Sequence, residues 1–317
     1  MSSLIPVAAP YTPEWYAARS TGIGASEMAA AVGLSDRRQP LQVFLQKTGQ
    51  LDDFEENEAI EAGRFMEDGN RRWYCHRTKT ELLDPAPWMH RHPDYPFIFA
   101  TPDGIVTPKL LLECKNTGEF IKKEWGDIGT DDVPTEYLVQ SNIQMSTMGA
   151  DECDLSVVIG GNKLRIFRLL RNDDLLRLIF SAAEELWERI QRNDPPPPDF
   201  SHKTSPRLIR AMHQSINDVR VMLSDSACAA RMEYEQLGKV IKDAEKRQGQ
   251  CQAIYEHEIG DNFAGVLEDG RMIRRKWIEG GHRSFDVAGR YDYRAVKFDN
   301  GPITENYPVL PCEVAGE

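Results

Sequence analysis

One stretch of the sequence decides the fold: Phe97-Ile-Phe-Ala-Thr-Pro-Asp-Gly-Ile-Val106, which is followed after three residues by Leu110-Leu-Leu-Glu-Cys-Lys115. It places Asp103 just before a turn and then an apolar strand that ends in Glu-x-Lys. Residues two apart in a strand point to the same face, so Glu113 and Lys115 project together and the cysteine between them points away. Two carboxylates and an ammonium group at the end of a buried strand are typical of sites that bind Mg²⁺ and activate water against a phosphodiester.

Each part of this stretch also has a purely structural interpretation. Asp-Gly after a proline is a common turn signal, and a lysine near a glutamate can be an exposed surface pair. The flanking residues favour the functional interpretation, because Leu110 to Leu112 are apolar on both faces and indicate a buried strand. The order Pro-Asp…Glu-x-Lys resembles the PD-(D/E)xK nuclease superfamily.

Length and composition predict a globular chain. Its 317 residues are 41% hydrophobic, enough for one large domain with an ample core and an appendage. No run of about 18 apolar residues predicts a membrane span, and we expect no leader or transit peptide. The six cysteines are scattered without a C-x-x-C pair, which indicates reduced thiols rather than disulfides, zinc or an iron–sulfur cluster. We therefore expect a cytoplasmic protein that does not contact membranes.

The charge distribution limits how the chain can contact nucleic acids. A net charge of −12 argues against general nucleic-acid binding, which requires a basic surface. The acidic excess lies in the amino-terminal part: residues 203–317 carry 17 Lys and Arg against 18 Asp and Glu, and the first 202 residues carry 21 against 32. A contact with DNA must therefore come from a local basic rim.

Four consecutive prolines, Pro195 to Pro198, predict a stiff polyproline linker. We expect a first domain over residues 1–194, a linker over 195–204 and an accessory region over 205–317. In the first domain, helices are predicted over 25–33, 41–48, 57–77, 134–148 and 173–191, and strands near 80–90, 97–100, 104–107, 110–115, 154–160 and 163–170. This order predicts an α/β core with a central mixed β-sheet flanked by helices.

The region after the prolines is predicted to be mainly helical. Residues 206–258 favour two helices broken near residue 224, since apolar positions recur at helical spacing, among them Met232, Leu237, Ile241 and Ile254. Residues 263–278 favour a small β-hairpin around Asp269-Gly270. This part could mediate oligomerisation, dock a partner or contact DNA, and a simple packed accessory is the alternative.

Further motifs make the sequence similar to the YqaJ-type viral recombinases, the phage exonucleases of the lambda-exonuclease group. They are Trp15-x-x-x-Arg19, Gly22–Glu27, the helix from Leu41 to Gly49, Glu61–Glu67 and Pro134-x-x-Tyr137-x-x-Gln140-x-x-x-Gln144. Together with the Asp…Glu-x-Lys stretch they cover about residues 13–190 in order. The resemblance implies that residues 1–194 are an exonuclease domain with the PD-(D/E)xK, or restriction-endonuclease-like, fold.

The resemblance also implies a metal site. Asp103 and Glu113 would bind a divalent cation, with Glu67 and the carbonyl of Cys114 as further ligands. Oxygen ligands suit a hard cation, so we expect Mg²⁺, for which Mn²⁺ would substitute. Lys115 would orient or deprotonate the attacking water and stabilise charge on the phosphorane. The structural alternatives are a solvated helix face for the Glu67 side chain and a plain ion pair for the lysine.

The glutamine helix offers neutral groups to the same site. Gln140 and Gln144 lie one turn apart on one helix face, where an amide can hold water or a phosphate oxygen without competing for the metal. We expect a catalytic role for Gln140, and we count Gln144, Tyr137 and Lys122 as further candidates. The alternatives are a polar helix face for the glutamines, a core position for the tyrosine and an ordinary surface lysine.

Resemblance to the lambda-type enzymes implies a pocket for a 5′-terminal phosphate, formed by Arg19 and Ser26 with help from Thr101. A serine near a helix N-terminus offers oriented N–H and hydroxyl donors, and an arginine can add a bidentate clamp. The alternative is an ordinary helix cap beside a surface arginine.

The function implied by the resemblance is a Mg²⁺-dependent 5′→3′ exonuclease on double-stranded DNA ends. It would leave 3′ single-strand overhangs for phage-type homologous recombination, beside a single-strand annealing recombinase. A homo-oligomeric ring and a phage or prophage origin in a bacterial cytoplasm are also implied. The alternatives are another PD-(D/E)xK endonuclease, a Cas4-like nuclease, or a catalytically retired DNA-binding or interaction protein on this fold. The lack of a cysteine cluster argues against the Cas4-like enzyme, and the intact trio argues against the retired protein.

Overall fold

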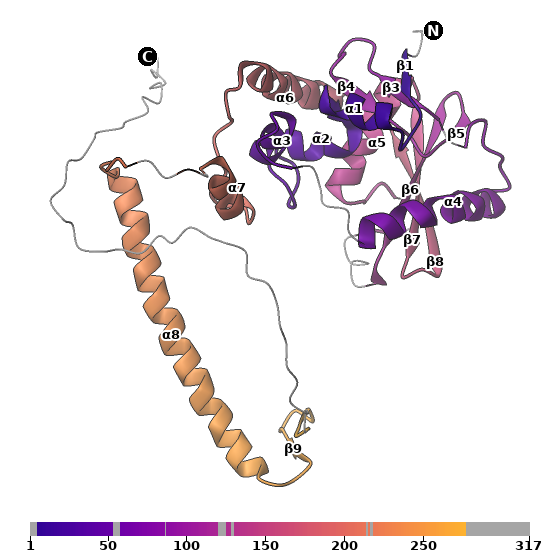
Figure 1. The fold of residues 1–317 in the computed structure, drawn as a ribbon. Helices are drawn as coiled ribbons and strands as arrows, with labels where there is room; N and C mark the ends of the chain where they lie inside the picture. The colour runs from indigo at the N-terminus through magenta and orange to yellow at the C-terminus, as the bar shows by residue number, and fades with distance from the viewer. Residues whose placement is uncertain are drawn as a thin grey trace. The chain divides into compact units, whose positions relative to one another are not determined.

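The chain divides into two compact units, Met1–Ser215 and Ile216–Glu317. The computed structural model describes residues 5–52, 58–85, 87–119, 125–127, 130–213, 215 and 218–276 (Figure 1). None of the helices in these ranges is long and apolar enough to cross a membrane.

The sheet that carries the Asp…Glu-x-Lys stretch has four strands in the order β5-β6-β7-β8. They are β5 (Gly104–Thr107), β6 (Leu110–Thr117), β7 (Glu152–Ile159) and β8 (Lys163–Leu170). The β6–β7 pair is parallel and the two outer pairs are antiparallel, so this is the mixed sheet that the sequence predicts. The β7–β8 turn uses Gly160 and Gly161 at φ +60° and +78°, a region that favours glycine.

Strands upstream of this stretch form a separate sheet, in the order β1-β3-β4-β2. They are β1 (Ile5–Ala8), β2 (Ile23–Gly24), β3 (Met89–Arg91) and β4 (Ile98–Ala100). The structure thus has a second four-stranded sheet in addition to the predicted mixed sheet. Pro102 lies between β4 and β5 and has no N–H to donate, which favours a break in the ladder there. Asp103 consequently lies at the junction of the two sheets.

Helices cover both faces of the β5–β8 sheet. The helices of the first unit are α1 (Pro13–Ser20), α2 (Ala25–Ala31), α3 (Pro40–Lys47), α4 (Glu58–Thr78), α5 (Thr135–Met148), α6 (Asp173–Arg192) and α7 (Ser205–Met212). On one face, Tyr74 of α4 packs with Leu112; on the other, Met145 of α5 packs with Leu111. Because neighbouring residues of β6 point to opposite faces, the strand is buried between the two helices, as its apolar run predicts.

Contacts of the first unit continue past the four prolines. Leu208 of α7 is fully buried in the cluster that also contains Phe44 of α3. The amide of Gln39 donates to Ser205 Oγ at 2.7 Å and its oxygen accepts from the Asp199 N–H at 3.0 Å. The domain boundaries at 194 and 204 remain predictions, but the segment from 199 to 212 is held on the first unit.

The second unit contains one long helix and a small hairpin. The helix is α8 (Asp225–Ile259), and the hairpin pairs β9 (Ala264–Val266) with β10 (Met272–Arg274). Helix α7 ends at Met212 and α8 begins at Asp225, so the two predicted helices are present, with a wider separation than a break near residue 224 implies. Ser224 caps α8 by accepting from the Ala227 N–H at 3.3 Å.

Candidate active site

The centre of the candidate site is an ion pair on β6. Lys115 Nζ lies 2.6 Å from Glu113 Oε1, which confirms that the two side chains share a face of the strand. The glutamate side chain is only 2% exposed and the lysine side chain 21%. A buried carboxylate requires compensation, and a lysine on the same face supplies a positive charge. The Cys114 side chain, which lies between them in sequence, packs on the other face of the strand with Tyr74 of α4.

The two glutamines of α5 hold the same carboxylate. The Gln140 amide donates to Glu113 Oε1, and the Gln144 amide donates to Oε2 at 2.7 Å. Gln144 is fully buried and also donates to the carbonyl of Thr101 at 3.3 Å. The structure therefore brings both glutamines to the site as anchors of the glutamate. Their expected contact with water or phosphate stays a prediction.

Asp103 lies beside this pair at the sheet junction. Its Oδ2 accepts from the backbone N–H of Cys114 at 2.7 Å. Burial raises the pKa of the Asp103 carboxyl well above its usual value, the charges of Glu113 and Glu67 raise it further, and Lys115 acts in the opposite direction. Three carboxylates are thus close enough to repel one another.

Glu67 of α4 is the third carboxylate, and it has two neighbours of its own. Arg71 pairs with its Oε1, and the Tyr11 hydroxyl donates to its Oε2 at 2.9 Å. Arg71 also donates to the carbonyl oxygen of Asp103 at 3.2 Å, so it ties α4 to the sheet junction. Burial and the nearby Glu67 charge raise the pKa of Tyr11 above its usual value. This hydroxyl therefore stays protonated and donates.

Helix α4 is fixed by a buried side chain that the sequence analysis missed. The Asn70 amide donates to the carbonyl oxygens of Lys115 at 3.1 Å and Ser156 at 3.0 Å, and Ser156 Oγ donates back to it at 2.6 Å. Asn70 lies one turn after Glu67. Its hydrogen bonds to the strands therefore fix the position of the Glu67 carboxylate relative to the sheet. The available signal is the spacing of Glu67, Asn70 and Tyr74, which places three polar side chains on one helix face.

Tyr137 lies beneath the lysine. The Lys115 Nζ atom is 5.2 Å from the centre of the Tyr137 ring, which is stacked on Trp125 at a centroid distance of 5.4 Å. An ammonium over an aromatic face is stabilised electrostatically. Burial on its own would lower the pKa of Lys115, but Glu113 and Asp103 outweigh it and raise the pKa above the usual value. Lys122, the other candidate near this region, lies outside the described residues.

Arg19 belongs to a second charged cluster, built around Glu27. The buried Glu27 carboxylate is 3.0 Å from Lys47 Nζ and 3.4 Å from Arg19 Nη2, and it accepts from the Gly24 N–H at 3.0 Å. Burial on its own would raise the pKa of Glu27, but Lys47, Arg19 and this N–H lower it to about 2. Two cations are thus held beside one carboxylate. The sequence gives no signal for the pairing of Glu27 with Lys47, because it joins parts of the chain 20 residues apart.

Thr101 links this cluster to the carboxylates. The Arg19 guanidinium lies over the Trp15 ring at 4.7 Å, and the Trp15 indole N–H donates to Thr101 Oγ1 at 3.3 Å. Since Gln144 bonds the carbonyl of the same threonine, one chain of contacts runs from α1 to Glu113. Ser26 is exposed in the first turn of α2, whose cap is Gly24. Its predicted phosphate contact stays a prediction.

Comparison with known proteins shows which proteins the chain is similar to. Residues 14–151 match the model of the YqaJ-like viral recombinase domain. This part of the chain is therefore similar to that domain. The chain is 28% identical over 259 residues to the uncharacterized protein YqaJ of Bacillus subtilis (strain 168). The aligned part covers 80% of each of the two chains.

Two solved exonucleases are also similar. The alkaline exonuclease from Laribacter hongkongensis is 22% identical, with a TM-score of 0.47, over 58% of this chain and 94% of that one. A phage-related exonuclease from Haemophilus somnus 129PT is 14% identical, with a TM-score of 0.42, over 54% and 96%.

The carboxylate oxygens at this site suit a hard divalent cation. In the described part of the chain, no three His, Cys, Asp or Glu side chains form a ready metal cluster. The oxygens of Glu113 and Glu67 face amides, cations and a hydroxyl. Burial raises the pKa of Asp103, and the negative charges of Glu113 and Glu67 raise it further. Carboxylate oxygens with excess negative charge are the ligands that Mg²⁺ and related ions prefer. Asp103 and Glu113 would hold such an ion. Glu67, whose charge acts on Asp103, would be a further ligand.

Proposed function

We propose that this protein is a metal-dependent exonuclease that digests double-stranded DNA from the 5′ end and leaves a 3′ overhang. One observation carries the proposal: Asp103, Glu113 and Lys115 converge at the sheet junction, with Glu113 held by two glutamines. A site for binding alone has no need of a half-buried lysine paired with a fixed carboxylate. A phosphodiesterase uses both, one for the cation and one for the developing negative charge.

The residues divide the chemistry between them. A divalent cation would supply Lewis-acid stabilisation of the phosphate and favour hydroxide over water. Gln140 and Gln144 orient the Glu113 carboxylate, so that its oxygens are preorganised. Lys115, with its raised pKa, is an ammonium group that stabilises charge on the pentavalent phosphorus and orients water. This favours charge stabilisation over proton abstraction for the lysine.

The 5′→3′ polarity is supported by the cluster around Glu27. Arg19 and Lys47 offer positive charge at the end of a contact chain that passes through Thr101 to the catalytic carboxylates. A terminal 5′-phosphate bound there would set the distance to the first scissile bond, which is what an end-specific enzyme requires. Ser26, exposed on the first turn of α2, would add a hydroxyl.

Partners and cofactor follow from the family resemblance. The metal is Mg²⁺, replaceable by Mn²⁺, and the substrate is a duplex end. The product, a 3′ single strand, is the substrate of a single-strand annealing recombinase, which is the partner in phage-type recombination. A homo-oligomeric ring around the duplex would allow processive digestion in the bacterial cytoplasm.

The deciding experiment compares three DNA substrates with and without Mg²⁺: a linear duplex with 5′-phosphates, the same duplex with 5′-hydroxyls, and a closed circle. Mononucleotides should be released from the first substrate fastest and not from the circle. EDTA should abolish release, and Lys115→Ala should lower its rate steeply. Equal cleavage of the circle would identify an endonuclease instead. Binding of duplex ends by the wild-type protein without any cleavage would identify a retired nuclease.

A further inference from the structure

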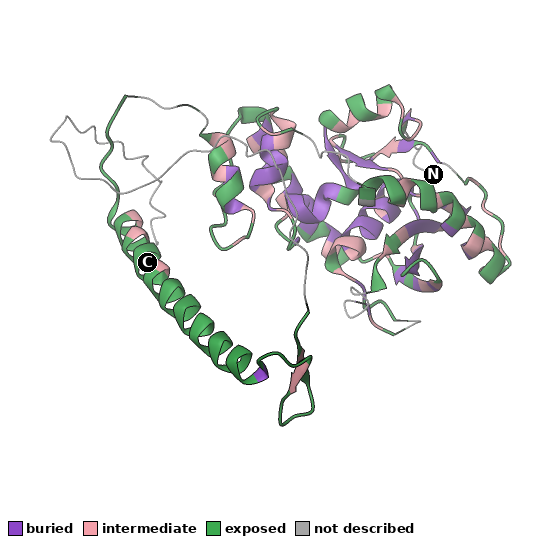
Figure 2. Ribbon diagram, turned by 60° about the horizontal axis from the view of Figure 1, so that its bottom comes forward, coloured by how far each residue is buried: buried purple, intermediate pink, exposed green. Residues whose placement is uncertain are grey.

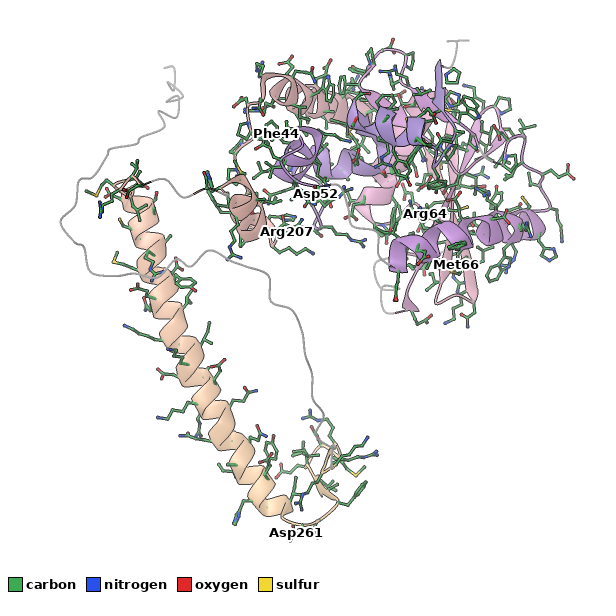
Figure 3. All side chains as sticks on the ribbon, viewed as in Figure 1. Phe44, Asp52, Arg64, Met66, Arg207 and Asp261 are labelled. Carbon is green, nitrogen blue, oxygen red and sulfur yellow. The ribbon has the colours of Figure 1, made fainter. Side chains whose placement is uncertain are left out.

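Helix α8 is long and almost entirely exposed. Its 35 residues correspond to about 52 Å. Only Ile259, at its last turn, is buried, and Figure 2 shows the rest of the helix as exposed or partly exposed. Figure 3 shows its side chains projecting on all sides from its start to Asp261, just beyond its end. Most helices in proteins derive their stability from packing of an apolar face, so an unpaired face of this length requires a partner.

The sequence of α8 has a seven-residue repeat. One series is Ala227, Tyr234, Ile241, Gln248 and Tyr255, and the second, three residues later, is Ala230, Leu237, Ala244 and Cys251. The alternating spacing of three and four residues aligns all nine on one narrow stripe, which is the pattern of a coiled-coil seam. The large members of this stripe are exposed: Tyr234 by 69%, Ile241 by 56% and Leu237 by 51%.

We propose that α8 pairs with the α8 helix of a second copy of this chain, in antiparallel orientation. The sizes of the seam residues carry the orientation. In a parallel pair each seam residue meets itself, so the seam would contain layers of two tyrosines at 234 and 255 and layers of two alanines at 227, 230 and 244. Packed helix axes stay roughly 8 to 10 Å apart, and one such distance cannot suit both a layer of two tyrosines and a layer of two alanines.

An antiparallel pair removes this conflict. With Ile241 of one copy opposite Ala244 of the other, the same register sets Ala230 against Tyr255 and Tyr234 against Cys251. The bulky side chains Tyr234, Ile241 and Tyr255 then each meet a small one, and Leu237 meets Gln248. The match is symmetric, because both copies use the same stripe, as an isologous two-fold interface requires.

The ends of the unit give independent support for this orientation. Met222 and Leu223, just before α8, are each more than half exposed, and so are Phe263, Val266 and Met272 of the hairpin region that follows it. Antiparallel pairing brings the start of one helix next to the end of the other. It therefore places the exposed apolar residues before one helix beside the exposed hairpin region of its partner. Parallel pairing would place the residues before one helix beside the same residues of the partner, and one hairpin beside the other. The occupant that fits both the seam and the ends is a second copy.

The first test measures the mass of the full-length chain by sedimentation equilibrium over a range of concentrations. Ile241→Lys, on the seam, should raise the concentration for half-association at least tenfold. Met232→Lys is the matched control, because Met232 is also exposed, by 66%, but lies outside the seam series, and it should change that concentration less than twofold. Association through the first unit would be equal in all three proteins and cancels. Identical association of the wild type and Ile241→Lys would overturn the proposal.

The second test fixes the orientation with disulfides. Tyr234→Cys should form an interchain bond with Cys251, mapped by mass spectrometry of peptides, because the two positions face each other only between copies. Within one helix they are 17 residues, or about 25 Å, apart, which no disulfide can bridge. Met232→Cys should form no bond to Cys251. A Cys251–Cys251 bond in the oxidised wild-type chain would show a parallel pair and overturn the antiparallel one.

Discussion

Lys115 and Gln140 approach the same oxygen atom of Glu113, one from β6 itself and the other from α5. The lysine nitrogen lies 2.6 Å from this Oε1, and Gln144 occupies the second oxygen at 2.7 Å. A buried carboxylate with donors on both oxygens is held in one orientation. The function of the trio therefore depends on α5 as much as on the strand.

Lys115→Ala should lower the rate of mononucleotide release from a 5′-phosphorylated duplex by about 100- to 1,000-fold, the range typical when a donor to developing charge is removed. Binding of the duplex should remain, because the carboxylates and the Arg19 cluster are retained. Lys109→Ala is the matched control: this lysine pairs at the surface with Asp151 and should leave the rate unchanged. A fall in binding equal to the fall in rate would assign the lysine to affinity instead.

Gln144→Ala should lower both activity and stability. It removes a donor from the buried Glu113 and leaves the carboxylate oxygen unsatisfied, which costs about 1–3 kcal/mol in the free energy of unfolding. Chemical denaturation measures the stability, and turnover at saturating DNA measures the activity. Gln191→Ala, on the exposed side of α6, should change neither. An active Gln144→Ala protein of normal stability would remove the anchoring role.

Glu27→Gln tests the buried cluster through the pH dependence of stability. The folded-state pKa of about 2 lies below the ordinary value of 4.5, so the charged form contributes to stability above pH 4.5, and the contribution is lost as pH falls towards 2. At pH 7 the variant should be less stable by about 3–5 kcal/mol, since it leaves the Lys47 charge buried without its partner.

The matching measurement for Glu27→Gln is urea denaturation between pH 2 and pH 7. The wild-type free energy of unfolding should fall more steeply than that of the variant between pH 4.5 and 2. Parallel curves would mean that Glu27 has the same pKa in the folded and unfolded chains.

Local patterns predicted the fold and site best where the chemistry lies within one strand or turn. The Asp103 turn, the shared face of Glu113 and Lys115, and the Gly160 hairpin depend on short-range geometry, and the structure has all three. The second sheet was missed, because pairing of β2 with β4 joins residues about 75 positions apart. Helix α1 was also missed, since no residue of it is buried and it shows no apolar stripe.

Partners between distant segments were equally hidden in the sequence. In the sequence, Asn70 is an ordinary polar residue. Its role follows from the packing of α4 on β6 and β7, where its amide donates to two strand carbonyls. Glu27 likewise gains its role only when α3 brings Lys47 to it. Composition and periodicity report which faces are apolar, but they do not report which polar side chain fills a particular gap in the packing.

Arg19→Ala should reduce the preference for a 5′-phosphate. The guanidinium is 30% exposed, lies over Trp15 and is held by Glu27, so it is oriented but still reachable by a ligand. Loss of a charge-assisted contact to phosphate costs about 1.5–3 kcal/mol, which corresponds to a tenfold to hundredfold fall in the ratio of rates on 5′-phosphorylated and 5′-hydroxyl ends. The ratio is the informative quantity, because general damage to the site lowers both rates together. Arg177→Ala, an exposed arginine of α6 paired with Asp174, controls for the loss of one positive charge and should leave the ratio unchanged. An unchanged ratio in Arg19→Ala would separate end recognition from this cluster while leaving the catalytic carboxylates in place.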